Sequence, residues 1–251
     1  MGEPIRHQGA ILAVACSLDG NMVLTGSEDG TAQVWQVETS QPLGEPMRHQ
    51  GGVWTVAFSP DGNMVLTGSE DGTAQVWQTK TGQPIGEPMG HQGTVLAVAF
   101  SPDDKMVLTG SEDGMVRLWQ VETGQLLSEP IYYQDGVWAM SFSSDGNMVL
   151  MGSDSGTARL WQTKTGQPVG EPMRHQGVVA TVAFSPNGKA VLTGSDDGTV
   201  RVWQVVKETL YSESINALQS EPINLLETWQ KKLSIQINEA GKVVLLYQKP
   251  E

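Results

Sequence analysis

One tryptophan series recurs at a constant interval along most of this chain. Its five members are each 42 residues apart: Trp35, Trp77, Trp119, Trp161 and Trp203. A histidine stands 28 residues before each tryptophan except Trp161, which has Tyr133 in that place. A fixed period of this length indicates repeated structural units, each of which buries its apolar surface against its neighbours.

The second repeat illustrates how each unit is expected to fold. Residues 53–58 are mainly β-branched and aromatic and precede a Ser-Pro-Asp-Gly turn, which predicts a strand followed by a tight turn. Two further strands are predicted at 64–69 and 73–78, joined by an Asp-Gly turn in which glycine can adopt a positive φ. The fourth segment, 83–89, contains two prolines that cannot donate ladder hydrogen bonds, so we expect it at an outer edge.

Four-stranded units that need a neighbour on each side stack well around an axis. At this point the chain resembles the WD-repeat β-propeller family, in which a histidine, a Ser or Thr, a tight-turn Asp and a Trp recur in each repeat. The resemblance covers about residues 3–215, although Trp-Gln replaces the family's Trp-Asp in all five repeats and only Gly90-His91 keeps its Gly-His. It implies an all-β fold, a propeller with five clear four-stranded blades.

The chain is expected to have two parts. Residues 1–215 should contain the propeller blades, with a partial strand at 1–6 followed by five repeats of 42 residues. In residues 216–251 the repeat stops, and we predict a short helix at about 221–232 and a β-hairpin over 233–247 that forms a partial, degenerate sixth blade. This tail resembles the segment that follows propellers in large bacterial signalling proteins. We therefore expect an incomplete ring from the C-terminal part of a larger protein.

Charge and composition restrict the partners. With 28 acidic residues against 15 basic ones the formal net charge is −13, so we expect neither nucleic acid nor membrane as a direct partner. No apolar stretch is long enough to span a bilayer and the N-terminus does not resemble a signal peptide, so we expect a cytoplasmic location. The single cysteine, Cys16, takes the repeat position of Phe58 and is expected to pack in the core.

The family resemblance implies a hydrogen-bonded network in each blade. In the second blade His49 would bond Asp71 and Ser69, and Ser69 would reach Trp77. The fourth repeat has lost both His and Asp, as expected if leaving one buried partner unsatisfied costs about 1–3 kcal/mol while losing both is nearly neutral. The structural residues implied in this way are His7, Asp29, Trp35, His49, Ser69, Asp71, Trp77, His91, Asp113, Trp119, His175, Asp197 and Trp203.

A candidate binding surface is indicated by two series of residues on the same face. An acid precedes each turn: Glu28, Glu70, Glu112, Asp154 and Asp196. Near the start of each inner strand stand Leu12, Trp54, Leu96, Trp138 and Ala180. Aromatic anchors surrounded by charge are typical of interface hot spots. The alternative is that these acids are solvated turn residues, partly neutralised by Arg6, Arg48 and Arg174.

We therefore predict a non-catalytic scaffold for protein–protein interaction, whose top face binds a basic or amphipathic protein segment within a multidomain signalling protein. Self-association through open end blades is a further expectation. No cofactor or metal is expected, because the histidines lie in separate blades. Two alternatives remain open: a hydrolase-type enzymatic propeller built on the repeated Ser, His and Asp, and a purely structural or oligomerising array.

Overall fold

The computed structural model describes residues 4–133, 135–206, 209–213, 233–237 and 243–247. These residues form strands and turns, and none of them lies in a helix. Within this part of the chain there is accordingly no helix that is long and apolar enough to cross a membrane. The helix predicted at about 221–232 falls outside the described residues.

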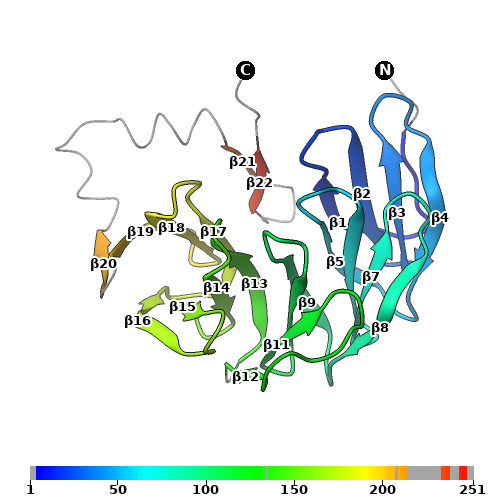
Figure 1. Ribbon diagram of the computed structural model, residues 1–251. Helices are drawn as coiled ribbons and strands as arrows, with labels where there is room; N and C mark the ends of the chain where they lie inside the picture. The colour runs from blue at the N-terminus through cyan, green and yellow to red at the C-terminus, as the bar shows by residue number, and fades with distance from the viewer. Residues whose placement is uncertain (1–3, 134, 207–208, 214–232, 238–242, 248–251) are drawn as a thin grey trace.

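Five antiparallel sheets of four strands each form the blades, arranged side by side in an arc (Figure 1). Blade one contains β1 (Ile11–Cys16), β2 (Met22–Ser27), β3 (Thr31–Gln36) and β4 (Pro42–Arg48). Blade two contains β5 (Val53–Phe58), β6 (Met64–Ser69), β7 (Thr73–Gln78) and β8 (Pro84–Gly90). Blade three contains β9 (Val95–Phe100), β10 (Met106–Ser111), β11 (Met115–Gln120) and β12 (Ile131–Tyr132).

The last two blades follow the same order. Blade four contains β13 (Val137–Phe142), β14 (Met148–Ser153), β15 (Thr157–Gln162) and β16 (Pro168–Arg174). Blade five contains β17 (Val179–Phe184), β18 (Ala190–Ser195), β19 (Val200–Val206) and β20 (Thr209–Glu213). The predicted five-bladed all-β fold is therefore confirmed, including the proline-bearing outer strands.

Tight turns between the second and third strands require glycine. Gly72, between β6 and β7, has φ 81°, a conformation that residues with a Cβ rarely adopt. A Cβ added there would also lie 3.0 Å from the carbonyl oxygen of His91. Glycine at this position therefore permits both the positive φ of the turn and the close approach of the His91 backbone.

The hydrophobic core lies between consecutive blades rather than within any one of them. Between blades one and two, for example, Leu24 and Val34 of the first blade pack with Val53, Val65 and Trp77 of the second. Equivalent clusters join blades two and three, three and four, and four and five. The inner strands β1, β5, β9, β13 and β17 contact one another in this order around the arc. Each blade is consequently stabilised by its neighbours.

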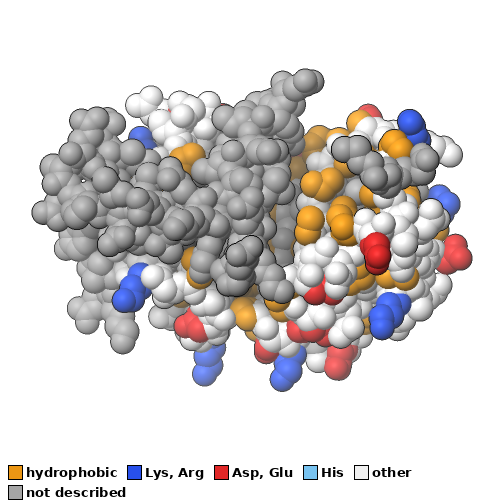
Figure 2. All heavy atoms as spheres, turned by 90° about the horizontal axis from the view of Figure 1, so that it is seen from above, with side chains coloured by type: hydrophobic (Ala, Val, Ile, Leu, Met, Phe, Trp, Pro, Cys, Tyr) orange, Lys and Arg blue, Asp and Glu red, His pale blue; other side chains and the backbone are white. Residues whose placement is uncertain are grey.

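The outward face of blade one is apolar and exposed. Ile11 is 44% exposed, whereas Val53, its counterpart in blade two, is fully buried. Val14 and Leu18 on the same blade are 56% and 71% exposed. Groups of hydrophobic side chains are also visible at the surface in the view from above (Figure 2). Cys16 is also exposed, so the expectation that it packs in the core is wrong: the counterpart Phe58 packs against blade one, and blade one has no such neighbour among the described residues.

The two ends of the chain differ from the regular repeats. Residues 4–10 form no strand, so the partial strand expected at 1–6 is not present where the structure describes that segment. The fourth strand of blade five is β20, which pairs with β19 through Trp203 and Ser212. The predicted hairpin is present as β21 (Leu233–Ile237) and β22 (Val243–Tyr247), which form a two-stranded sheet of their own.

Candidate interaction surface

A hydrogen-bonded chain crosses the second blade from its turn to its tryptophan. His49 Nδ1 lies 3.2 Å from Asp71 Oδ2, and His49 Nε2 lies 2.7 Å from Thr67 Oγ1. The indole N–H of Trp77 donates to the same Thr67 hydroxyl at 2.8 Å. Because the carboxylate can only accept, the arrangement assigns the proton of neutral His49 to Nδ1.

The residue that joins histidine to tryptophan is therefore Thr67, and the expected role of Ser69 is wrong. Trp77 pairs with Val65, so Thr67 is its diagonal neighbour, while Ser69 lies two residues further along β6. The Ser69 hydroxyl donates instead to the Gly51 carbonyl at 3.0 Å. It also accepts the Asp71 backbone N–H at 3.1 Å, which holds the turn. The sequence shows a periodic threonine at this position. The register of β6 against β7 decides which of the two hydroxyls lies beside the tryptophan.

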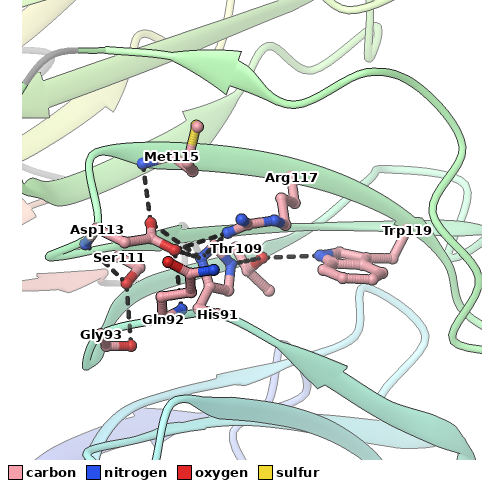
Figure 3. Close-up of polar contacts among 9 residues, drawn as sticks. All are labelled: His91, Gln92, Gly93, Thr109, Ser111, Asp113, Met115, Arg117 and Trp119. Carbon is pink, nitrogen blue, oxygen red and sulfur yellow. Dashed lines mark hydrogen bonds and ion pairs between the residues drawn. The ribbon is translucent and has the colours of Figure 1, made fainter.

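Blade three adds a cation to the same network (Figure 3). Arg117 donates to Asp113 at 2.9 Å and lies against Nδ1 of His91. Burial lowers the pKa of His91 to about 4; Asp113 opposes this shift and Arg117 adds to it. Burial would raise the pKa of Asp113, but hydrogen bonds from the Gln92 backbone and from Arg117 lower it to about 2. His91 is therefore neutral, and Asp113 charged, near neutral pH.

Blade four lacks three members of the network together. Tyr133 replaces the histidine, Ser155 replaces the aspartate and Met151 replaces the threonine. Among the described residues Trp161 Nε1 has no hydrogen-bond partner, because Met151 offers no hydroxyl. Tyr133 is buried, which raises its pKa to about 12, and its hydroxyl donates a long bond to the Met151 carbonyl at 3.4 Å. From the sequence we predict the loss of histidine and aspartate only, and the structure adds the threonine. This concerted replacement supports the view that the three side chains act as a unit.

The turn network presents the five predicted acids on the surface. In blade two the backbone N–H of Glu70 donates to the carbonyl of Gly52 at 2.9 Å, while its side chain is exposed. Each of the other acids makes the equivalent backbone bond, and each is likewise exposed: Glu28, Glu112, Asp154 and Asp196. The backbone of each acid is thus held in place, and its carboxylate is left for solvent or a ligand.

A β-bulge lies near the start of every inner strand on this face. In blade two Val53 pairs with Ser69 and Thr55 with Gly68, so Trp54 is the extra residue of the bulge. The same irregularity falls on the other four predicted residues: Leu12, Leu96, Trp138 and Ala180. A bulge bends the strand and re-aims a side chain. All five residues of this series consequently share one structural position next to the acid turns.

The bulge residues differ in accessibility. Leu96 is only 9% exposed, so its expected role in ligand binding is not supported. Trp54, Trp138 and Leu12 are half-buried, and Ala180 is exposed. The indole N–H of Trp138 donates to the Asp154 carboxylate of the same blade, which brings a predicted anchor and a predicted acid into direct contact. The structure thus brings members of the two series together within blade four.

The alternative, in which arginines partly neutralise these acids, is not supported by the ion pairs of the described residues. Among the described residues, no Lys or Arg nitrogen lies within 4.0 Å of the five carboxylates. Arg48 and Arg174 instead end the outer strands β4 and β16, opposite Thr31 and Thr157. Arg6 and Arg48 line a groove beside Trp35. These arginines therefore form no ion pairs with the acidic series.

The repeated Ser, His and Asp do not assemble as a hydrolytic triad. A nucleophilic serine must lie within hydrogen-bond reach of the histidine that activates it. In blade two the Ser69 hydroxyl bonds the Gly51 carbonyl, and the histidine bonds Thr67 instead. Over the described part of the chain, no three His, Cys, Asp or Glu side chains converge on a position suited to a metal ion.

Comparisons with known proteins agree with this geometry. A family model described as "IFT122 first beta-propeller" matches residues 42–250, and one described as "WD domain, G-beta repeat" matches residues 4–36. The crystal structure of the computationally designed Ika8 protein is similar, with a TM-score of 0.75 and 33% sequence identity over 96% of this chain and 72% of that chain. A search of curated proteins finds no match. Because one family model matches most of the chain and the blades repeat the same turn network, the chain belongs to the WD-repeat β-propeller family.

Proposed function

We propose that this propeller is a non-catalytic interaction module whose face formed by the bulge residues and the five acids binds a basic or amphipathic protein segment. Propellers of the WD-repeat family generally mediate protein–protein interactions, which supports the module. The proposal extends to a cytoplasmic location and to a role within a multidomain signalling protein.

One observation carries the choice of surface. Five exposed carboxylates occupy equivalent positions and have no Lys or Arg within 4.0 Å among the described residues. Their fields add and attract a cationic partner. Trp54 and Trp138 stand in bulges beside them and provide apolar surface of the kind that anchors a partner.

Exchange of both tryptophans for alanine should weaken partner binding strongly. A protein captured from lysate by the wild-type chain would be purified, and its affinity measured for wild type and for Trp54→Ala/Trp138→Ala. We expect a loss of about 2 kcal/mol or more, a reduction of roughly 30-fold, as for hot-spot residues. Unchanged affinity would place the functional surface elsewhere.

The acids are tested separately through association rate. Glu28→Gln/Glu70→Gln/Glu112→Gln should slow association and reduce its dependence on salt, because rim charges mainly steer the encounter. A matched variant, Glu38→Gln/Glu87→Gln/Glu122→Gln, changes the net charge equally but away from this face. Equal effects of the two triple variants would contradict a local role of the acidic series.

The open face of blade one supports a second proposal, association with another copy of this chain. Each blade from two to five packs the counterparts of Ile11 and Val14 against the preceding blade. The blade-five face of a second copy has the same repeat chemistry, so a head-to-tail contact would reproduce an interface that the chain already contains.

Charging this face should therefore reduce self-association. In sedimentation experiments, Val14→Lys/Leu18→Glu is expected to shift the chain toward monomer. Leu126→Lys/Leu127→Glu, at two other exposed positions, provides the matched control. A sharp wild-type monomer at high concentration would exclude this proposal.

A further inference from the structure

Blade four contains a cleft at the same repeat positions as the groove of blade one, where Asp29 stands in place of Ser155. The cleft has a volume of about 440 Å³, and Ser155, Thr157, Arg159 and Arg174 contribute to its walls. It coincides with the blade in which histidine, threonine and turn aspartate are replaced together.

In the other four blades this position holds a carboxylate with a constant set of donors. The backbone N–H two residues after the aspartate donates to its Oδ1 at 2.9 Å in each case, from Thr31, Thr73, Met115 and Thr199. In blade two the backbone N–H of Gln50 donates to the other oxygen at 2.8 Å. These oriented donors make the turn suited to an oxyanion.

Blade four retains donors but lacks the acceptor. Thr157 occupies the position of Thr73, while Ser155 supplies a hydroxyl that lies 2.8 Å from the Ser153 hydroxyl. Arg159 is the counterpart of Arg117, which in blade three donates to the turn aspartate at 2.9 Å. Among the described residues, no carboxylate oxygen lies within 4.0 Å of Arg159.

A second arginine faces the same position. Arg174 pairs with Thr157 across β15 and β16, residues 157 and 159 lie on one face of β15, and both arginines line the cleft. The backbone carbonyl of Arg174 accepts a bond from Arg201 of blade five at 2.6 Å, which anchors the strand end. Asp135 also lines the cleft, and the three charges leave a net positive site in an acidic protein.

We propose that this cleft binds a carboxylate group of a partner protein, which takes the position of the missing aspartate. Arg159 and Arg174 supply charge-assisted hydrogen bonds, and the Thr157 backbone supplies a neutral donor. Tyr132, which is 62% exposed beside the cleft, provides apolar surface for the residue that carries the acid. The site adjoins the acidic face at the turn of Asp154 and Ser155, but its two arginines give it the opposite charge preference.

The probe is a blocked pentapeptide of glycines with one tyrosine and one glutamate, compared with its glutamine counterpart. Binding is followed by NMR through the indole N–H signal of Trp161, which lines the cleft. We expect the glutamate peptide to shift this signal and the glutamine peptide to bind at least 10-fold more weakly. A phosphoserine peptide distinguishes the two oxyanions: stronger binding than glutamate would replace the carboxylate assignment by a phosphate one.

Variants of the cleft residues are expected to weaken or strengthen peptide binding according to the charge that they add or remove. Ser155→Asp restores the internal carboxylate and should reduce peptide binding at least 10-fold, as should Arg159→Gln. Asp135→Asn removes the opposing charge and should strengthen binding several-fold. Arg48→Gln, which changes the counterpart of Arg174 in blade one, and Trp54→Ala/Trp138→Ala should have no effect. Equal binding by Ser155→Asp and wild type, or equal binding of the two peptides, would overturn the proposal.

Discussion

Replacing Thr67 with valine is expected to lower the free energy of unfolding by about 2 to 4 kcal/mol. The change keeps the shape of the side chain but removes the hydroxyl that joins His49 to Trp77. Thr67 is fully buried, so both of its partners would be left without a hydrogen bond in the interior. Each unsatisfied buried group costs about 1 to 3 kcal/mol, and the sum dominates any gain from the added methyl group.

Denaturant unfolding measures this effect, with Thr55→Val as the matched control. Thr55 is half-buried in β5, and the structure shows no hydrogen bond from its hydroxyl among the described residues. A double-mutant cycle with His49→Ala then isolates the coupling, which should amount to at least about 1 kcal/mol for groups in one network. A Thr67→Val protein as stable as Thr55→Val would show that the hydroxyl does not hold the blade.

Acidification is expected to destabilise the propeller between about pH 6.5 and pH 4, in part through His91. Its pKa is lowered to about 4 by burial, against about 6.5 in an unfolded chain. Because the unfolded state then binds the proton more tightly, stability falls as the pH decreases through this window. The full difference corresponds to about 3 kcal/mol from one histidine. Burial also lowers the pKa values of His49 and His175, which adds to the loss in the same direction.

The variant Arg117→Gln tests whether the charge of Arg117 contributes to the low pKa of His91. Glutamine occupies the equivalent position in blades one and two, as Gln33 and Gln75, so the side chain is compatible with the fold. Removing the neighbouring positive charge should raise the pKa of His91 and move its NMR titration to higher pH. Wild-type His91 titrating near pH 6.5, or an unchanged value in the variant, would contradict this account.

The repeat pattern predicted most of the fold because each blade is a local structure. Apolar runs, Asp-Gly turns and prolines specify strands, hairpins and an edge within 42 residues, and the same result is obtained five times. The acids and bulge residues were also found from their position in the repeat. The recurrence of these residues is informative because equivalent positions in different blades have the same backbone conformation.

The individual side-chain contacts are harder to predict from the sequence. Thr67 and Ser69 are both hydroxyl residues on one face of β6, and only the β6–β7 register makes the first the neighbour of Trp77. Met151 stands in the position of Thr67 and completes the concerted change in blade four, but this role too becomes clear only from the strand register. Leu96 and Leu12 have the same place in the repeat, yet Leu96 is buried and Leu12 is half-buried.

The sequence alone determined the repeat, its strands, its turn chemistry and the residues that recur on one face, since these depend on local backbone preference and on periodicity. Tertiary structure decided which hydroxyl enters the network and that Arg48 and Arg174 stand apart from the acidic series. It also decided that Cys16 is exposed and that Ser155, Arg159 and Arg174 line one cleft in blade four. These features depend on strand register and on which blades have a neighbour. Both are set by contacts between residues far apart in the chain, where no single repeat carries the information.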